Sequence, residues 1–263
     1  MTVVDQTLAA VSERVQRLLE AEQTPQRDGF LQAVDPAIKI VGLFALIVVA
    51  VSIGTWPAQA VLLALVAGLT LGSRVSPATL ARRIAIVPAA SLVIVAPQLV
   101  LLSGNSVLGP VTAEGVSYVL TFVLRVTVSV SLLSLLILTT RVADLLAGFR
   151  RLGVPELGVS LIAITYRHLQ VFFDELSRVV RARQSRTIAD RSAGQTWRES
   201  GSMLGSFLLR AFERGERVQR NARARGGTTM AAYPSDSDLS RADGVFVTMV
   251  ATVVAARIGM WVL

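Results

Sequence analysis

The sequence predicts an all-α protein that crosses a membrane several times and carries long helices beside it. Of its 263 residues, 52% are apolar and 17% are charged, whereas a soluble domain carries about 25% charged residues. The mean hydropathy is +0.59. The charges are also segregated: residues 40–140 contain five charged side chains, and residues 141–243 contain 17 arginines and 11 acidic residues. We therefore expect an apolar block followed by a basic amphipathic block.

Residue usage excludes several kinds of site. The chain has no cysteine, which excludes a disulfide framework and any thiolate metal or redox site. Its single histidine, His168, excludes a multi-histidine metal cluster, and we expect it to be a structural polar residue. The sequence also lacks the G-x-x-x-x-G-K-[S/T] loop that binds nucleotide phosphates. We therefore predict no catalytic residues, no metal site and no cofactor.

Five apolar segments have about the length needed to span a bilayer, which is roughly 20 residues for a helix. They are residues 36–55, 57–73, 84–103, 116–138 and 244–263. The second is short, and the third contains Pro88 and Pro97. Neighbouring helices can satisfy the carbonyls that a proline frees, so we expect kinks at these prolines and no helix ends. Asp35 and Pro36 form a typical helix start, with Asp as the cap.

The arginines of the short links predict the orientation. The link 74–83 carries three arginines, whereas the links near Trp56 and at 104–115 carry none, so the first should be cytoplasmic. The protein is then a multi-pass cell-membrane protein. Its predicted parts are a cytoplasmic N-terminal segment (1–35), four transmembrane helices (36–138), a cytoplasmic helical region (139–243) and a C-terminal transmembrane helix (244–263).

The cytoplasmic region should contain one short and two long amphipathic helices. The short one covers residues 141–152, and the long ones cover about 157–186 and 196–225. Both long helices begin apolar and end strongly basic. Favourable interaction with the helix dipole contributes only about 0.3–1 kcal/mol, which does not account for so many arginines. Gly201 and Gly205 form a GxxxG pattern that suits close packing against the other long helix.

Four stretches in this order carry a resemblance to a known family. They are DPAIK at 35–39, a stretch at 139–155 ending in RRLGVP, TYRHLQVFFDEL at 165–176, and GSMLGSFLLRAFERGERVQRNARARG at 201–226. Together they resemble the transmembrane T component of energy-coupling factor (ECF) transporters, especially the cobalt/nickel-type T proteins called CbiQ. The resemblance covers about residues 30–260.

The resemblance implies two arginine-centred docking motifs. In this family such motifs lie at the C-terminal ends of two cytoplasmic coupling helices, where a pair of ATPase subunits docks. The second motif corresponds to Ala224, Arg225 and Gly226, and the first to Ser185, Arg186 and Thr187, where threonine replaces the usual glycine. A register at residues 182–184 fits the spacing from TYRHL less well. Without the resemblance, both arginines could equally be solvated helix-end charges.

The implied function is that of a non-catalytic coupling scaffold. Such a protein transmits the motion of two ATP-binding subunits to a separate substrate-binding membrane subunit, the S component, which takes up cobalt, nickel or a vitamin. Its partners would be those subunits and the lipid bilayer, with no nucleic acid. A membrane-tethered nucleic-acid or anionic-lipid binder is less favoured, because 11 acidic residues are interleaved with the 17 arginines.

One alternative is a stand-alone transporter or channel, which requires ionisable residues at mid-membrane depth. Only Arg125 lies at such a position in the sequence. It could pair with Glu114, bind a partner, or extend its charge to the membrane surface.

Overall fold

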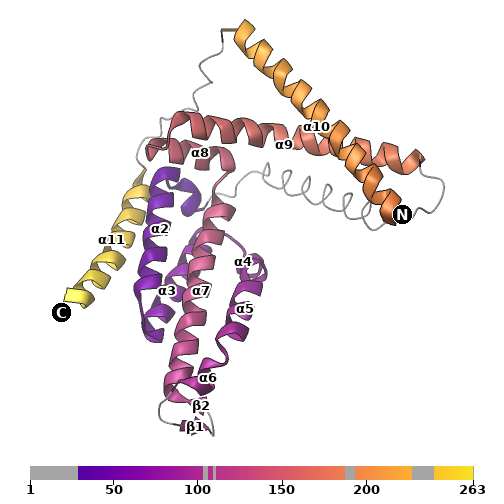
Figure 1. Cartoon of the computed structure of the whole chain (residues 1–263). Helices are drawn as coiled ribbons and strands as arrows, with labels where there is room; N and C mark the ends of the chain where they lie inside the picture. Colours follow the sequence, from indigo (N-terminus) through magenta and orange to yellow (C-terminus); the bar gives the residue numbers. More distant parts are fainter. Residues whose placement is uncertain (1–28, 103–105, 109–110, 187–192, 227–239, 263) are drawn as a thin grey trace. The chain divides into compact units, whose positions relative to one another are not determined.

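The computed structural model describes residues 29–102, 106–108, 111–186, 193–226 and 240–262. Apart from one antiparallel pair of short strands, β1 (Ser106–Leu108) and β2 (Val111–Thr112), the regular structure in these residues is helical (Figure 1). The predicted all-α class is therefore confirmed. The described chain forms two compact units. Residues 29–153 and 240–262 form the bundle unit, and residues 154–226 form the two-helix unit.

The bundle unit contains the apolar helices. They are η1 (Leu31–Ala33), α2 (Pro36–Ser52), α3 (Trp56–Gly72), α4 (Pro77–Ile84), α5 (Ile86–Val95), α6 (Gln98–Leu101), α7 (Ala113–Thr139), α8 (Val142–Arg151) and α11 (Arg241–Val262). Two helices, α7 and residues 241–259 of α11, are long and apolar enough to span a membrane. Residues 77–84 (α4) and 86–101 (α5 and α6) together make a third candidate span if the two bent parts are counted as one. The apolar helices α2 and α3 have 17 residues each, at the lower limit for a span. Each predicted apolar segment thus coincides with helical structure, as expected for a membrane protein.

A helix break lies near each of the two prolines of the third segment. The axis bends by 43° between α4 and α5, one turn before Pro88, whose missing N–H leaves the carbonyl of Ile84 without its helical partner. Pro97 lies in the break between α5 and α6. The chain is thus kinked near both prolines, but the expectation of no helix ends is wrong: α4 ends at Ile84 and α5 ends at Val95, because each proline removes a helical hydrogen bond. The link before the third segment is also not a simple loop, because α4 already begins at Pro77 with Ser76 as its cap.

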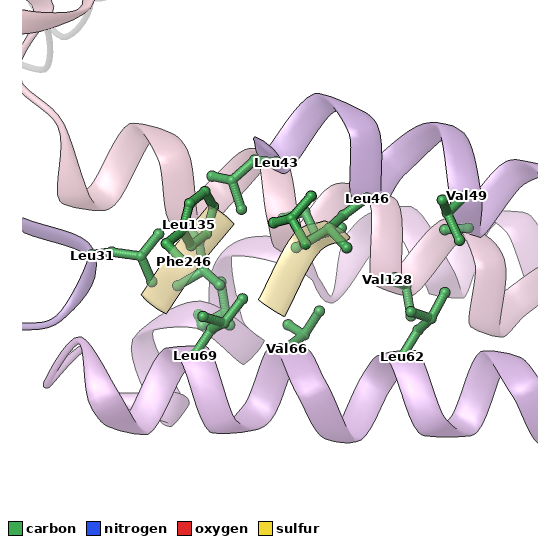
Figure 2. Packing of buried hydrophobic residues seen from close by; sticks show 14 of the residues in the cluster. Leu31, Leu43, Leu46, Val49, Leu62, Val66, Leu69, Val128, Leu135 and Phe246 are labelled. Atoms are coloured by element: carbon green, nitrogen blue, oxygen red, sulfur yellow. The ribbon is translucent and has the colours of Figure 1, made fainter. Parts of the chain in front are cut away.

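The core of the bundle unit lies between α2, α3, α7 and α11. Figure 2 shows Leu46 of α2, Val66 of α3 and Phe246 of α11 within this cluster. Phe246 lies against the backbone of Gly42, where an added Cβ would come within 2.4 Å of the ring. Lipid tails are as apolar as leucine, so close packing of this kind holds membrane helices together better than exclusion of water alone.

Polar groups fix the first turn of α2. The carboxylate of Asp35 accepts a hydrogen bond from the N–H of Ala37 at 2.8 Å, so the predicted Asp-Pro helix start is confirmed. One turn later Lys39 is 2% exposed. Its Nζ donates to Thr140 Oγ1 at 3.1 Å and to the carbonyl oxygen of Thr139 at 3.3 Å. These contacts tie the start of α2 to the end of α7.

Candidate functional site

The two-helix unit consists of α9 (Glu156–Arg186) and α10 (Ala193–Ala224). Their bounds lie within three residues of the two long helices expected from the sequence. With 31 and 32 residues and a rise of 1.5 Å per residue, each is about 45–50 Å long. Both helices keep their apolar beginnings and arginine-rich ends, so the unit presents two long amphipathic rods.

An aromatic contact and an ion pair join the two rods. The ring centroids of Phe172 on α9 and Phe207 on α10 lie 6.4 Å apart, edge to face at 74°. One turn further along each helix, Arg210 Nη1 donates to Glu175 Oε1 at 3.1 Å. His168 lies one turn before Phe172, with its ring 6.4 Å from the phenyl ring. Spacings of three and four residues place these side chains on one face of each helix.

Gly201 and Gly205 lie outside this crossing. Both are exposed, and a Cβ added to either would meet no described atom within 4 Å. The structure therefore does not place the GxxxG pattern in the predicted contact between the two long helices. The apolar periodicity of residues 168–180 and 203–212 was visible in the sequence. It did not reveal that Phe172 faces Phe207.

The C-terminal end of α10, up to Gly226, lies within the described residues. Gly226 has φ +71°, and its N–H donates to the carbonyl of Arg223 at 3.1 Å. A left-handed glycine after the last turn is a common helix stop. Ala224, Arg225 and Gly226 are all exposed. The predicted second motif thus occupies an exposed helix end.

The end of α9 is described in part. Arg186 is the last residue of the helix. Ser185 is exposed, and its hydroxyl donates to the carbonyl of Ala182 at 3.0 Å. Thr187 lies outside the described residues, so the effect of threonine at this position stays a prediction. The two motif arginines, Arg186 and Arg225, each stand at or directly after the C-terminal end of a long helix.

The two rods also expose charged and apolar surfaces. Beside the crossing is a cavity of about 210 Å³, lined in part by Glu175, Arg210, Arg214 and Arg217. Its cationic rim is suited to carboxylates of a protein partner. Large apolar side chains are exposed near the start of α9 and the middle of α10. They are Leu157, Leu161, Ile162, Leu204, Leu208, Leu209 and Phe212. Exposed apolar area of this extent is typical of a protein or membrane contact.

Metal-ligating side chains do not gather in the described residues. Among them, no group of three or more His, Asp or Glu side chains is arranged to hold a metal ion. The chemistry that these residues offer is recognition through arginines and apolar side chains.

Comparison with known proteins identifies the family. Residues 28–234 match the family model CbiQ, described as cobalt transport protein. The chain is 27% identical over 225 residues to the cobalt transport protein CbiQ of Rhodobacter capsulatus, covering 83% of this chain and 89% of that one. It is also 28% identical over 106 and 109 residues to two uncharacterized proteins of Methanocaldococcus jannaschii, MJ1571 and MJ1089. Those matches cover 40% and 41% of this chain, and they span 36% and 40% of the archaeal proteins.

Proposed function

Because the chain belongs to the CbiQ cobalt transport protein family, we propose that it is the transmembrane coupling subunit of an ECF-type importer. The chain is a membrane transport component. In that role it neither hydrolyses ATP nor selects the substrate. Two ATP-binding subunits supply the motion, and a separate membrane subunit binds the cargo, which is cobalt, nickel or a vitamin.

The observation that carries the proposal is the exposed end of α10. Arg225 follows the last turn and Gly226 ends the helix, so the guanidinium is presented to a partner. A guanidinium offers a planar set of donors that fits carboxylates and carbonyl oxygens. Arg186 occupies the matching position on α9. Two such ends can engage two ATP-binding subunits at once.

The crossing makes the two rods suitable levers. When ATP binding brings the two ATP-binding subunits together, the helix ends that they hold move with them. The contacts of Phe172 with Phe207 and of Glu175 with Arg210 then act as a pivot that couples the two rods. Their exposed apolar side chains provide the surface for the substrate-binding membrane subunit. This arrangement requires the two-helix unit to be cytoplasmic, as the arginines of the links predict.

Charge reversal tests the docking role. Arg186→Glu and Arg225→Glu, singly and together, are expressed with the ATP-binding subunits, and the complex is purified through a tag on this chain. We expect each single variant to retain less of the ATP-binding subunits and the double variant to retain almost none. Arg220→Glu is the matched control, since Arg220 lies on the same helix and makes an exposed pair with Glu216 at 3.8 Å.

Full retention by the double variant would overturn the docking assignment. Uptake by the wild-type chain in vesicles without any ATP-binding subunit would instead support the stand-alone transporter.

A further inference from the structure

Asp35 is contacted by the end of α8 and by the first turn of α11, the two bundle-unit helices that precede and follow the two-helix unit in the sequence. On one side, Arg151 at the end of α8 donates from Nη1 to Asp35 Oδ2. On the other side, Asp243 in the first turn of α11 accepts a hydrogen bond at Oδ1 from the N–H of Asp35, at 2.7 Å. These contacts join positions 116 and 208 residues apart in the sequence. The start of α2 is therefore bonded to both the end of α8 and the start of α11.

Helix α8 packs closely on α2, and only a short link joins it to α9. Gly148 of α8 lies so near the first turn of α2 that an added Cβ would be 3.1 Å from both the nitrogen of Ala37 and the carbonyl carbon of Pro36. Arg151 follows three residues later. Gly153 then adopts φ +86°, and α9 begins at residue 156. A displacement of the start of α9 thus acts on α8 through a connection of four residues.

The start of α11 contacts the same turn. The hydroxyl of Ser240 donates to the carbonyl of Ala33 at 3.2 Å. Its N–H donates to Asp243 Oδ2 at 2.7 Å, which is a capping arrangement for α11. Asp243 is 2% exposed, so this contact is sheltered from solvent. Residues 33–35 therefore contact both the end of α8, before the two rods, and the start of α11, after them.

The ion pair is the part of this arrangement that a capping role does not require. Ala37 already uses Asp35 Oδ1 for the helix cap, whereas Arg151 uses Oδ2. The side chain of Asp35 is 7% exposed and that of Arg151 is 27% exposed, so solvent screens the pair less than a surface pair. Asparagine at position 35 would keep a cap and lose the charge.

We propose that Asp35 and Arg151 are positioning residues that form a joint, which passes movement of α9 and α10 into α2. The proposal rests on the coupling role proposed above. With the pair intact, the start of α9 and the start of α2 move together. Since α2 packs against α7 and α11, movement at this turn reaches the core of the bundle unit. Without the pair, the two rods move while α2 stays behind.

Spin-label distances test the joint in the chain alone. The sequence contains no cysteine, so a Val41→Cys and Leu152→Cys pair gives one defined distance between exposed sites on α2 and at the end of α8. We expect a narrow distance distribution for the wild-type background and for Arg151→Lys. Arg151→Gln and Asp35→Asn should broaden it at least two-fold. The matched control is Arg141→Gln, which removes an exposed arginine at the other end of α8.

The assembled complex tests transmission. In nanodiscs with the ATP-binding subunits, ATP should shift the distance between labels on α2 and α7 in the wild type. Arg151→Gln should retain ATP hydrolysis within two-fold and lose this shift, and Arg151→Lys should restore it. A loss of folding would lower both ATP hydrolysis and the ATP-induced change in distance. Loss of the distance change alone therefore distinguishes a joint from a structural role.

Two results separate failure of the joint from failure of the coupling role. An unchanged narrow distribution in Arg151→Gln, or equal broadening in Arg141→Gln, overturns the joint and leaves the docking role intact. A wild-type chain that binds no ATP-binding subunits overturns the coupling role, whatever the distances in the isolated chain show.

Discussion

Arg125 of α7 donates a hydrogen bond from Nη2 to the backbone carbonyl oxygen of Ile53, at 2.7 Å. Ile53 directly follows the last residue of α2, as its C-cap. Two other side chains donate hydrogen bonds to carbonyl groups at the same helix end. Arg257 of α11 donates to the carbonyl of Ser52 at 2.8 Å, and Gln59 of α3 donates to that of Ala50 at 2.6 Å. The last carbonyls of a helix lack partners within it and carry a partial negative charge.

Of the partners considered for Arg125, the structure shows a protein group: its guanidinium donates to the carbonyl oxygen at the end of α2. The charge on which the stand-alone channel interpretation depended is thus engaged in joining α7 to α2.

Arg125→Ala should therefore lower the free energy of unfolding by about 1.5–3 kcal/mol, the usual contribution of a hydrogen bond to a charged group. Thermal unfolding in detergent, followed by tryptophan fluorescence, measures this. Equal stability of Arg125→Ala and the wild type would contradict the capping role.

Replacement of Lys39 should separate the effect of charge from that of volume. Lys39→Ala leaves a cavity and removes both hydrogen bonds to the end of α7, so we expect a loss of about 2–5 kcal/mol. Lys39→Met keeps most of the volume and removes a charge that is costly to bury, so its effect should be smaller. The same unfolding measurement compares the two variants. A larger loss for Lys39→Met would mean that the charge itself stabilises the turn.

The aromatic contact should hold the two rods together more strongly than the ion pair. Phe207→Ala removes an edge-to-face pair that contributes about 0.5–1.5 kcal/mol beyond its buried area. Arg210→Ala removes an exposed ion pair of about 0.2–1 kcal/mol. Hydrogen exchange of residues 203–212 should therefore increase more in Phe207→Ala. Equal exchange in the two variants would show that the ring contact is not the main link.

Alanine at Gly201 or Gly205 tests where the rods meet. Both positions are open in the structure, and alanine favours a helix by up to about 1 kcal/mol over glycine. Each variant should thus leave the stability of the isolated chain unchanged or raise it. A close crossing at the GxxxG pattern predicts the reverse, since the added methyl groups would separate the helices. Circular dichroism during thermal unfolding distinguishes these outcomes.

Local signals in the sequence were sufficient for most of the helices. The start at Asp35 and Pro36, the stop at Gly226 and the bend before Pro88 all depend on residues within one turn. Such contacts are set by the covalent geometry of the chain and by its nearest neighbours. The helix α4 was not predicted within the link 74–83, because the turn-like sequence from Ser76 also caps a helix.

By itself the sequence determined the all-α class, the positions of the apolar helices, the two long basic-ended rods and the family. Tertiary structure alone decided which distant groups meet: Phe172 with Phe207, Arg125 with the backbone carbonyl of Ile53, and Arg151 with Asp35. The physical reason is that helical periodicity defines a face but not the partner of that face. A partner 35 to 116 residues away is selected by how whole helices pack, and no local spacing records that choice.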